Sequence, residues 1–294
     1  MCDEITNRED KAWLKQHGIT RRQFGKYSSL AAMLAALPPV ANAAYVVDED
    51  VEIETPDGMA DAYWVRPSTG AHAAVILWPD IVGIRTAKRM MGKRLAQSGY
   101  AVLVVNPYYR THRGQVVEDG QTFSTPGVRD MLMPHARSLS PETCVSDGGA
   151  FISWLDAQPE VDTSRKVGTM GYCMTGSYVF RLAAAYPDRV GAGASFHGGG
   201  LVSDADNSPH KLISRMADDA GILVAIADND DERQPEAKDV LRASFDDAGI
   251  FGEVEVYADA QHGWCPLDSA VYHQAQAERA WNRMQLLFDN HLKS

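Results

Sequence analysis

The sequence has 294 residues, of which 45% are hydrophobic and 23% are charged. This composition is typical of a globular protein with an ample core, and the length allows one large domain or two small ones. The formal net charge of −11 argues against binding to nucleic acid or to an anionic membrane surface. The four cysteines, Cys2, Cys144, Cys173 and Cys265, form no Cys-x-x-Cys pair, so neither a zinc ribbon nor a thioredoxin motif is indicated.

Residues 1–43 carry the pattern of an export signal. Arg21 and Arg22 stand in a polar frame, residues 27–37 are rich in Ala and Leu without any charge, and residues 41–43 read Ala-Asn-Ala. The alternative is an amphipathic helix of the mature protein, but the apolar stretch has no polar face, and it is too short for stable membrane insertion. We therefore predict a twin-arginine type signal cleaved after Ala43, with the twin-arginine export machinery as a partner. The mature domain, residues 44–294, is then periplasmic or secreted.

The mature region alternates between strand and helix patterns. Two runs, 46–54 and 60–65, flank a Thr-Pro-Asp-Gly turn and predict an antiparallel hairpin. We expect further strands at 73–78, 101–105, 167–173, 193–196, 222–227 and 253–257, and helices at 86–97, 142–157, 177–186, 236–247 and 269–291. The polar, Gly-containing residues 111–138 predict an irregular surface excursion. Continuously apolar strands between helices indicate an α/β fold with a mostly parallel sheet covered on both faces.

Residues 166–176 read as strand, tight turn and helix, with Cys173 at the tip of the turn. This pattern is typical of a nucleophile elbow, and the N-terminus of the following helix favours a thiolate. Gly171 and Gly176 flank the cysteine, where a side chain would clash with the neighbouring strand or helix. Thr175 stands where a second glycine is usual. The turn alone is equally consistent with an inert, buried cysteine.

The partners of a thiol nucleophile follow later in the chain. His262 lies in a Gly-containing loop just past the last predicted strand, and an earlier strand ends in Asp228, Asp230 and Asp231. The order of nucleophile, acid and histidine is that of the α/β-hydrolases. We therefore predict that Cys173 is the nucleophile, that His262 is its base, and that one of the three aspartates orients the histidine.

Four segments together resemble the dienelactone hydrolase family: Gly-Tyr-Cys-Met-Thr-Gly (171–176), Asn-Pro-Tyr-Tyr-Arg (106–110), Ala-Asp-Asn-Asp (227–230) and Ala-Gln-His-Gly-Trp (260–264). The likeness runs from about residue 46 to the C-terminus. It implies an α/β-hydrolase fold and a Cys-Asp-His triad that needs no cofactor and no metal. The implied reaction is the hydrolysis of a small ester or lactone through a thioester acyl-enzyme.

The same resemblance implies roles for individual residues. It favours Asp230 as the acid, and it places an oxyanion hole at the backbone N–H groups of Ile81 and Met174. It also places Asp80 beside the resting thiol, where the best-known members have a glutamate.

Substrate binding is expected around Arg110, which matches the first of two arginines that hold the substrate carboxylate in the family. The alternative is that Arg110 pairs with a surface acid, which is common in so acidic a chain. The second arginine is missing, since residues 263–266 read Gly-Trp-Cys-Pro. Tyr108 and Trp264 are expected to wall the pocket. The predicted substrate is a small ester or lactone with one anionic end and an apolar body.

Two other classes of function fit parts of the pattern. One is a binding module that keeps the fold without turnover. The other is a thiol redox protein, for which Cys265 is the plausible resolving partner of Cys173.

Overall fold

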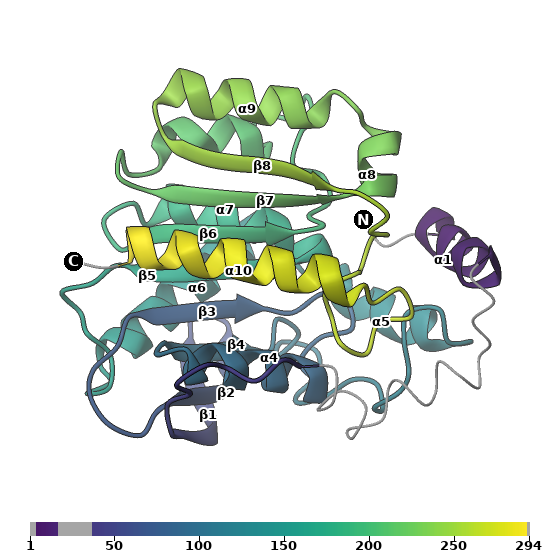
Figure 1. Ribbon diagram of the computed structural model, residues 1–294. Coiled ribbons are helices and arrows are strands. Elements are labelled where there is room, and N and C mark those ends of the chain that lie inside the picture. The colour runs from purple at the N-terminus through teal and green to yellow at the C-terminus, as the bar shows by residue number, and fades with distance from the viewer. Residues whose placement is uncertain (1–3, 17–36, 293–294) are drawn as a thin grey trace.

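The computed structural model describes residues 4–16 and 37–292, in which eight strands form one sheet (Figure 1). The strands are β1 (Val46–Thr55), β2 (Gly58–Pro67), β3 (Ala74–Trp78), β4 (Ala101–Val105), β5 (Val167–Tyr172), β6 (Val190–Phe196), β7 (Gly221–Ala227) and β8 (Phe251–Tyr257). Their order is β1-β2-β4-β3-β5-β6-β7-β8. The pairs β1–β2 and β2–β4 are antiparallel and the remaining pairs are parallel, which confirms the predicted hairpin and the mostly parallel sheet.

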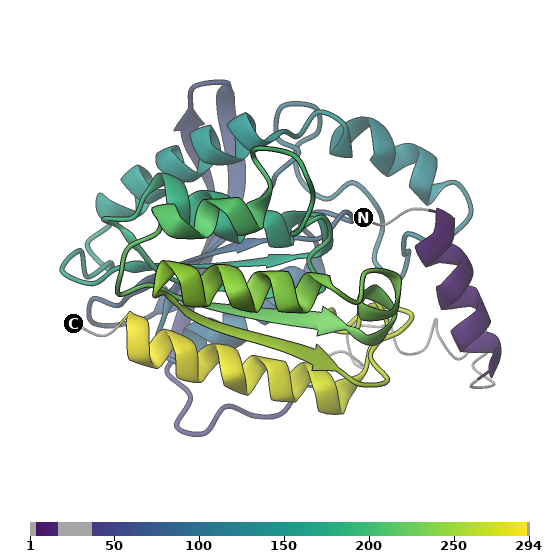
Figure 2. The ribbon, with the colours of Figure 1, turned by 90° about the horizontal axis from the view of Figure 1, so that it is seen from above.

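Helices cover both faces of this sheet (Figure 2). On one face lie α4 (Thr86–Gln97) and α10 (Gln274–His291), and on the other lie α6 (Pro141–Asp156), α7 (Gly176–Ala185) and α9 (Ala237–Ala248). The central strands are buried along their whole length, and their side chains alternate between the two cores: Ile76 and Trp78 face one, Val75 and Leu77 the other. A strand buried on both sides must be continuously apolar, which is the pattern that the sequence carries.

The segment predicted as an irregular surface excursion contributes to a small core of its own. It contains α5 (Val128–Ala136), and its Val117, Phe123 and Leu132 pack with Ile81 and Tyr108 beside the carboxyl ends of the strands. The expectation of a purely surface segment is therefore wrong. Its polar residues concealed a few apolar positions that are buried against the sheet edge.

Two other element boundaries differ from the expectation. Helix α10 begins at Gln274 rather than residue 269, because the preceding residues form turns and the His273 ring accepts the Gln276 N–H. The acidic end of β7 is a short helix, α8 (Asp228–Arg233), rather than a turn. Short 3-10 helices η1 (Cys173–Thr175) and η2 (Pro209–Arg215) complete the described elements.

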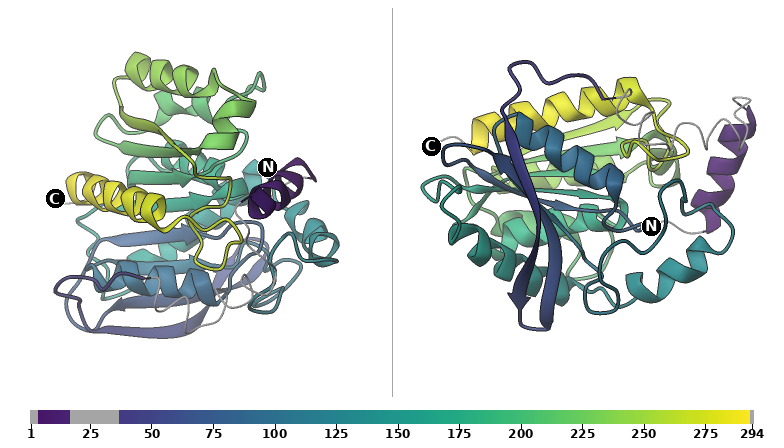
Figure 3. Two further views of the ribbon diagram at one scale, coloured as in Figure 1. Left: turned by 45° about the vertical axis from the view of Figure 1, so that its right-hand side comes forward. Right: turned by 90° about the horizontal axis from the view of Figure 1, so that it is seen from below.

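Helix α1 (Glu4–Gln16) lies at the same end of the sheet as α5 and α8 (Figures 1 and 3). The two arginines of the predicted signal and residues 27–36 of its apolar stretch fall outside the described residues. Leu37 packs against the core under α4 and α10, and the Ala44 N–H donates to the Gln97 carbonyl oxygen. Within the described ranges, no helix has the length and apolar character needed to cross a membrane.

Candidate active site

The strand-to-helix turn holds Cys173 in a strained conformation. β5 ends at Tyr172, and the single turn η1 leads directly into α7. Cys173 has a φ of 58°, in the left-handed region that residues with a side chain seldom adopt. Its side chain is buried and lines a pocket. A strained residue at such a turn is the expected geometry of a nucleophile elbow.

Two glycines and a threonine make this turn possible. A Cβ at Gly171 would lie 2.2 Å from the Thr175 carbonyl oxygen, and one at Gly176 would lie 2.5 Å from the Gly198 Cα. The Thr175 hydroxyl accepts from the Tyr172 N–H at 2.9 Å and lies 3.0 Å from two carbonyl oxygens at the end of β3. Thr175 therefore stands at the position of the usual glycine, and its hydroxyl links the elbow to the neighbouring strand.

Asp230 and His262 meet where β7 and β8 end. His262 Nδ1 lies 2.6 Å from Asp230 Oδ2, and the His262 backbone N–H donates to Asn229 Oδ1 at 2.8 Å. The other two candidate acids have different partners: the Asp228 carboxylate accepts a backbone N–H of the β8 loop, and Asp231 pairs with a lysine of α9. Of the three aspartates that the sequence left open, the one that contacts His262 is Asp230.

The surroundings of His262 favour its positively charged form. Burial lowers the pKa of the ring, but the Asp230 charge and then Cys173 favour the imidazolium and raise that pKa to about 10. Burial likewise disfavours the charged Asp230, yet the His262 charge and hydrogen bond hold the pKa of this carboxyl below its usual value. An imidazolium between a carboxylate and a cysteine is the environment that activates a thiol.

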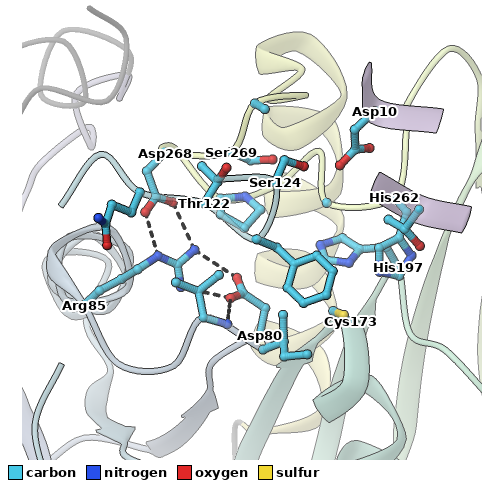
Figure 4. A pocket seen from close by; sticks show the side chains of 18 residues that line it. Asp10, Asp80, Arg85, Thr122, Ser124, Cys173, His197, His262, Asp268 and Ser269 are labelled. Carbon is cyan, nitrogen blue, oxygen red and sulfur yellow. Dashed lines mark hydrogen bonds and ion pairs between the residues drawn. The ribbon is translucent and has the colours of Figure 1, made fainter. Parts of the chain in front are cut away.

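The pocket beside Cys173 encloses about 70 Å³, which is room for several water molecules (Figure 4). Its apolar lining includes Ile81, Phe123 and Pro266. Helix α1 contributes Thr6 and Asp10 to the lining. Burial raises the pKa of the Asp10 carboxyl to about 7. The pocket therefore receives residues both from the sheet edge and from the N-terminal segment.

A buried charge network forms one side of the pocket, and the sequence did not reveal it. The Arg85 guanidinium donates to Asp80 and to Asp268 at distances of 2.6–3.0 Å, and Lys88 Nζ lies 3.2 Å from Asp80 Oδ2. Although burial opposes its charge, Arg85 and then Lys88 hold the pKa of Asp80 well below its usual range. Asp80 lines the pocket, and its carboxylate contacts these cations and the Val82 backbone N–H.

Tyr108 lies beneath the two residues expected to form the oxyanion hole. Its hydroxyl donates to the Ile81 carbonyl oxygen at 2.7 Å and lies 3.8 Å from Met174 Sδ. Ile81 lines the pocket, whereas Tyr108 is fully buried and is not among the described lining residues. Tyr108 therefore does not wall the pocket as predicted. It links the segment that carries Ile81 to the one that carries Met174.

Arg110 lies outside the pocket. Its guanidinium donates to Asp57 and to the buried Asp147 at 2.6–2.9 Å, and it stacks 4.6 Å above the Tyr109 ring. Two carboxylates thus fill the fork that was expected to hold a substrate carboxylate. The prediction that Arg110 binds the substrate is therefore wrong. The sequence did not reveal this pairing, because nothing local in it places α6, the helix that carries Asp147, against Arg110.

Trp264 supports the site from behind. It is fully buried, is not among the described lining residues, and stacks on Tyr257 with ring centroids 5.3 Å apart. It also packs edge-on against His197, with ring centroids 5.2 Å apart, and the His197 ring lies 4.9 Å from that of His262. His197 lines the pocket and was not predicted. Its signal in the sequence was its place at the end of a strand, before three glycines.

The cysteines form no redox pair within the described residues. Cys144, Cys173 and Cys265 are buried and outside any disulfide, and Cys265 lines a different cavity from Cys173. In the described part of the chain, no cluster of three or more His, Cys, Asp or Glu residues is arranged to hold a metal ion.

Comparison with known proteins assigns the family. Residues 60–292 match the dienelactone hydrolase family. The chain belongs to that family. A Salmonella typhi protein provisionally named as a carboxymethylenebutenolidase is 26% identical over 250 residues, covering 79% of this chain and 88% of the relative. The carboxymethylenebutenolidase of Rhodococcus opacus is 24% identical over 227 residues, covering 76% of this chain and 83% of that enzyme.

Solved structures agree on the fold. A Klebsiella pneumoniae protein provisionally named as a dienelactone hydrolase superposes with a TM-score of 0.71 at 22% identity, covering 84% of this chain and 100% of the other. The dienelactone hydrolase-like promiscuous phosphotriesterase P91 superposes with a TM-score of 0.68 at 21% identity, covering 84% and 99%. The α/β-hydrolase fold is therefore confirmed. As a member of this family, the chain is an ester or lactone hydrolase.

Proposed function

We propose that this chain hydrolyses small esters or lactones with Cys173 as nucleophile, His262 as base and acid, and Asp230 as the orienting carboxylate. The observation that carries the proposal is the contact of 2.6 Å between Asp230 and His262, beside a cysteine with a φ of 58° at the tip of the elbow. Cys173 and His262 line the same pocket. Nucleophile, orienter and base thus follow β5, β7 and β8, whose carboxyl ends lie along one edge of the sheet.

The first half of the reaction forms an acyl-enzyme. The Cys173 sulfur attacks the carbonyl carbon, a C–S bond forms, and the electron pair of the carbonyl bond moves to its oxygen. The tetrahedral adduct then collapses, the C–O bond to the alcohol breaks, and His262 gives its proton to the departing oxygen. In a lactone the alcohol stays attached to the acyl chain, so the ring opens while the thioester forms.

The second half returns the enzyme to its starting state. Once sulfur is acylated, it no longer carries the charge that favours the imidazolium, and His262, which has given its proton to the departing oxygen, is neutral and able to accept one. His262 takes a proton from water, the hydroxide attacks the thioester, and the C–S bond breaks to release the acid and the Cys173 thiolate. Asp230 holds the ring in one tautomer throughout.

In this proposal, the backbone N–H groups of Ile81 and Met174 stabilise the negative charge that develops on the reacting carbonyl oxygen. One such donor is worth about 3 kcal/mol in the transition state. The Tyr108 hydroxyl, which bonds the Ile81 carbonyl oxygen and reaches Met174, supports this assignment because it links the two segments.

The experiment that tests the function compares wild type with Cys173→Ala and Cys173→Ser on 4-nitrophenyl acetate and on γ-butyrolactone. We expect wild type alone to turn over efficiently. Mass spectrometry of the quenched reaction should find the acyl group on the peptide that contains Cys173. Turnover by Cys173→Ala at the wild-type rate would end the proposal.

We also propose that residues 1–43 direct export through the twin-arginine machinery and are then removed. Support comes from the arginine pair, the uncharged stretch at 27–37 and the Ala-Asn-Ala site. The test is mass spectrometry of the exported form, which should begin at Ala44, together with replacement of Arg21 and Arg22 by lysine, which should leave precursor in the cytoplasm. An exported form that retains residues 1–43 would contradict the cleavage.

A further inference from the structure

The guanidinium donors of the pocket are already occupied. Arg85 is the one lysine or arginine among the described lining residues, and a guanidinium has five N–H donors. Its Nε and its two terminal nitrogens donate to Asp80, Asp268 and the Gly83 carbonyl oxygen in five hydrogen bonds of 2.6–3.1 Å. No donor of Arg85 remains for a substrate carboxylate. The pocket is therefore suited to a neutral substrate.

His197 is a polar side chain in this pocket whose ring has no hydrogen-bond partner among the described residues. Its side chain is 1% exposed and lines the pocket. Neither ring nitrogen makes a hydrogen bond to any of the described residues. A buried polar atom without a partner is costly, and natural proteins keep one where a ligand or a water molecule completes it.

The chain holds His197 at this place by a strained turn. Its φ is 40°, in the left-handed region, and its backbone N–H donates to the Ala225 carbonyl oxygen at 2.8 Å. Two residues later, the Gly199 N–H donates to the carbonyl oxygen of Cys173 at 3.2 Å. The turn that presents His197 is thus bonded to the elbow that presents the nucleophile. In Figure 4 the two histidines, His197 and His262, lie beside Cys173.

The His197 ring is neutral. Burial, and then the nearby charges of His262 and Lys88, hold its pKa well below the usual value. A neutral imidazole offers one N–H donor and one bare nitrogen as acceptor. A hydroxyl group can satisfy either nitrogen, because it both donates and accepts, whereas a carboxylate can only accept.

We propose that His197 recognises a hydroxyl group on a neutral ester or lactone, close to the carbonyl that Cys173 attacks. This inference rests on the proposed function and names its substrate class. His197 would then be a specificity residue that touches the substrate, while Cys173, His262 and Asp230 perform the chemistry.

The first test uses two lactones that differ in one hydroxyl, γ-butyrolactone and α-hydroxy-γ-butyrolactone. The enzymatic rate for each lactone is divided by the rate at which hydroxide alone hydrolyses that lactone. We expect wild-type kcat/KM to favour the hydroxylated lactone by about ten- to a hundredfold, the usual effect of one buried hydrogen bond.

His197→Phe, which keeps a ring but no nitrogen, should bring this ratio close to one. His197→Asn, which tolerates a positive φ and keeps a donor and an acceptor, should retain part of it. His72→Phe is the matched control, because His72 comes just before β3 and thus lies at the end of the sheet opposite the pocket. This variant should keep the wild-type ratio.

The second test separates recognition from turnover. In the Cys173→Ala variant labelled with ¹⁵N-histidine, α-hydroxy-γ-butyrolactone should shift the ring nitrogens of His197, and γ-butyrolactone should shift them less. If wild type hydrolyses neither lactone but this shift is present, the hydrolase mechanism fails and the recognition by His197 stands. If wild type hydrolyses both lactones equally, or if His197→Phe lowers both rates by the same factor, the recognition fails and the hydrolase stands. Absence of a His197 shift at saturating hydroxylated lactone also overturns the inference.

Discussion

Among the described residues, three buried cysteines differ in chemistry because their surroundings differ. Burial raises the pKa of the Cys144 and Cys265 thiols well above the usual value, which leaves both groups protonated and unreactive. Cys173 is equally buried, but it interacts with the His262 imidazolium. A count of cysteines therefore says little about reactivity, which here depends on one charged neighbour.

At the residue scale, the assignment of the acid gives a sharp prediction. Asp230→Asn should lower kcat for 4-nitrophenyl acetate by about two to four orders of magnitude, because the amide no longer favours the imidazolium or fixes its tautomer. Asp228→Asn and Asp231→Asn change the same kind of group in the same helix without touching His262, and each should stay within about threefold of wild type. A larger loss in either control than in Asp230→Asn would contradict the assignment.

His262 also predicts how stability depends on pH. Its folded pKa, about 10, is raised above the unfolded value, so its contribution is complete below about pH 6.5 and is lost as pH rises toward 10. The melting temperature of wild type should therefore exceed that of His262→Gln most near pH 6, and the difference should narrow steadily up to pH 10. A difference that is constant across this range would show that the ring does not carry its charge in the folded protein.

Among the helices and strands, each candidate site residue follows a strand. Asp80 follows β3, Cys173 β5, His197 β6, Asp230 β7 and His262 β8. Because these five strands are parallel neighbours, their carboxyl ends lie along one edge, where the side chains of distant segments meet. The site is a consequence of strand order more than of any single motif.

The sequence therefore predicted what depends on local pattern. Apolar runs that alternate with helical segments predicted the sheet, and the turn flanked by glycines predicted the elbow. The order of Cys173 and His262 along the chain indicated the pair of nucleophile and base. It did not predict the contact of Arg85 with Asp268, which are separated by 183 positions, or that of Arg110 with Asp147. Ion pairs between distant elements leave no periodicity, so only the packed fold identifies them.

Tyr108 illustrates how one element positions another. Tyr108→Phe should lower kcat about tenfold with little change in KM, because the hydroxyl braces the segments that carry the oxyanion donors, and these act mainly in the transition state. Tyr109→Phe is the matched control, since its hydroxyl bonds Thr55 and Asp147 instead. Its kcat should match that of wild type. Equal kcat values for the two variants would show that Tyr108 only supports packing.

Arg110 links three elements: the segment after β4, the turn between β1 and β2, and helix α6. Arg110→Ala should reduce the free energy of unfolding by about 1–3 kcal/mol, because it leaves the buried Asp147 with fewer donors. Kinetic parameters for neutral and carboxylated esters should change by the same small factor. A loss of kcat/KM on carboxylated esters alone would show that Arg110 contacts the substrate after all.

At the scale of the whole molecule, the N-terminal segment and the hydrolase domain meet at the pocket. Thr6 and Asp10 of α1 line it, and Glu9 pairs with Arg233 and with the Asn229 side chain at the end of β7. All eight strands lie after residue 43, so the proposed cleavage would remove α1 and leave the sheet complete. Processing of the chain would then change the access of substrate to Cys173.

The effect of α1 on the pocket is tested by comparing the full-length chain with residues 44–294. The shorter form should have the higher kcat/KM at pH 5, because α1 no longer occupies part of the pocket. Packing of α1 raises the pKa of Asp10 from 3.8 to about 7, mainly through burial, so packing is strongest below pH 4, weakens as pH rises to 7, and changes little beyond that. The ratio of the two activities should therefore fall between pH 5 and 7. Asp10→Asn in the full-length chain should abolish this pH dependence, whereas Glu9→Ala should lower the ratio at every pH by removing the pair with Arg233. Equal activity of both forms at pH 5 would show that α1 does not restrict the pocket in solution.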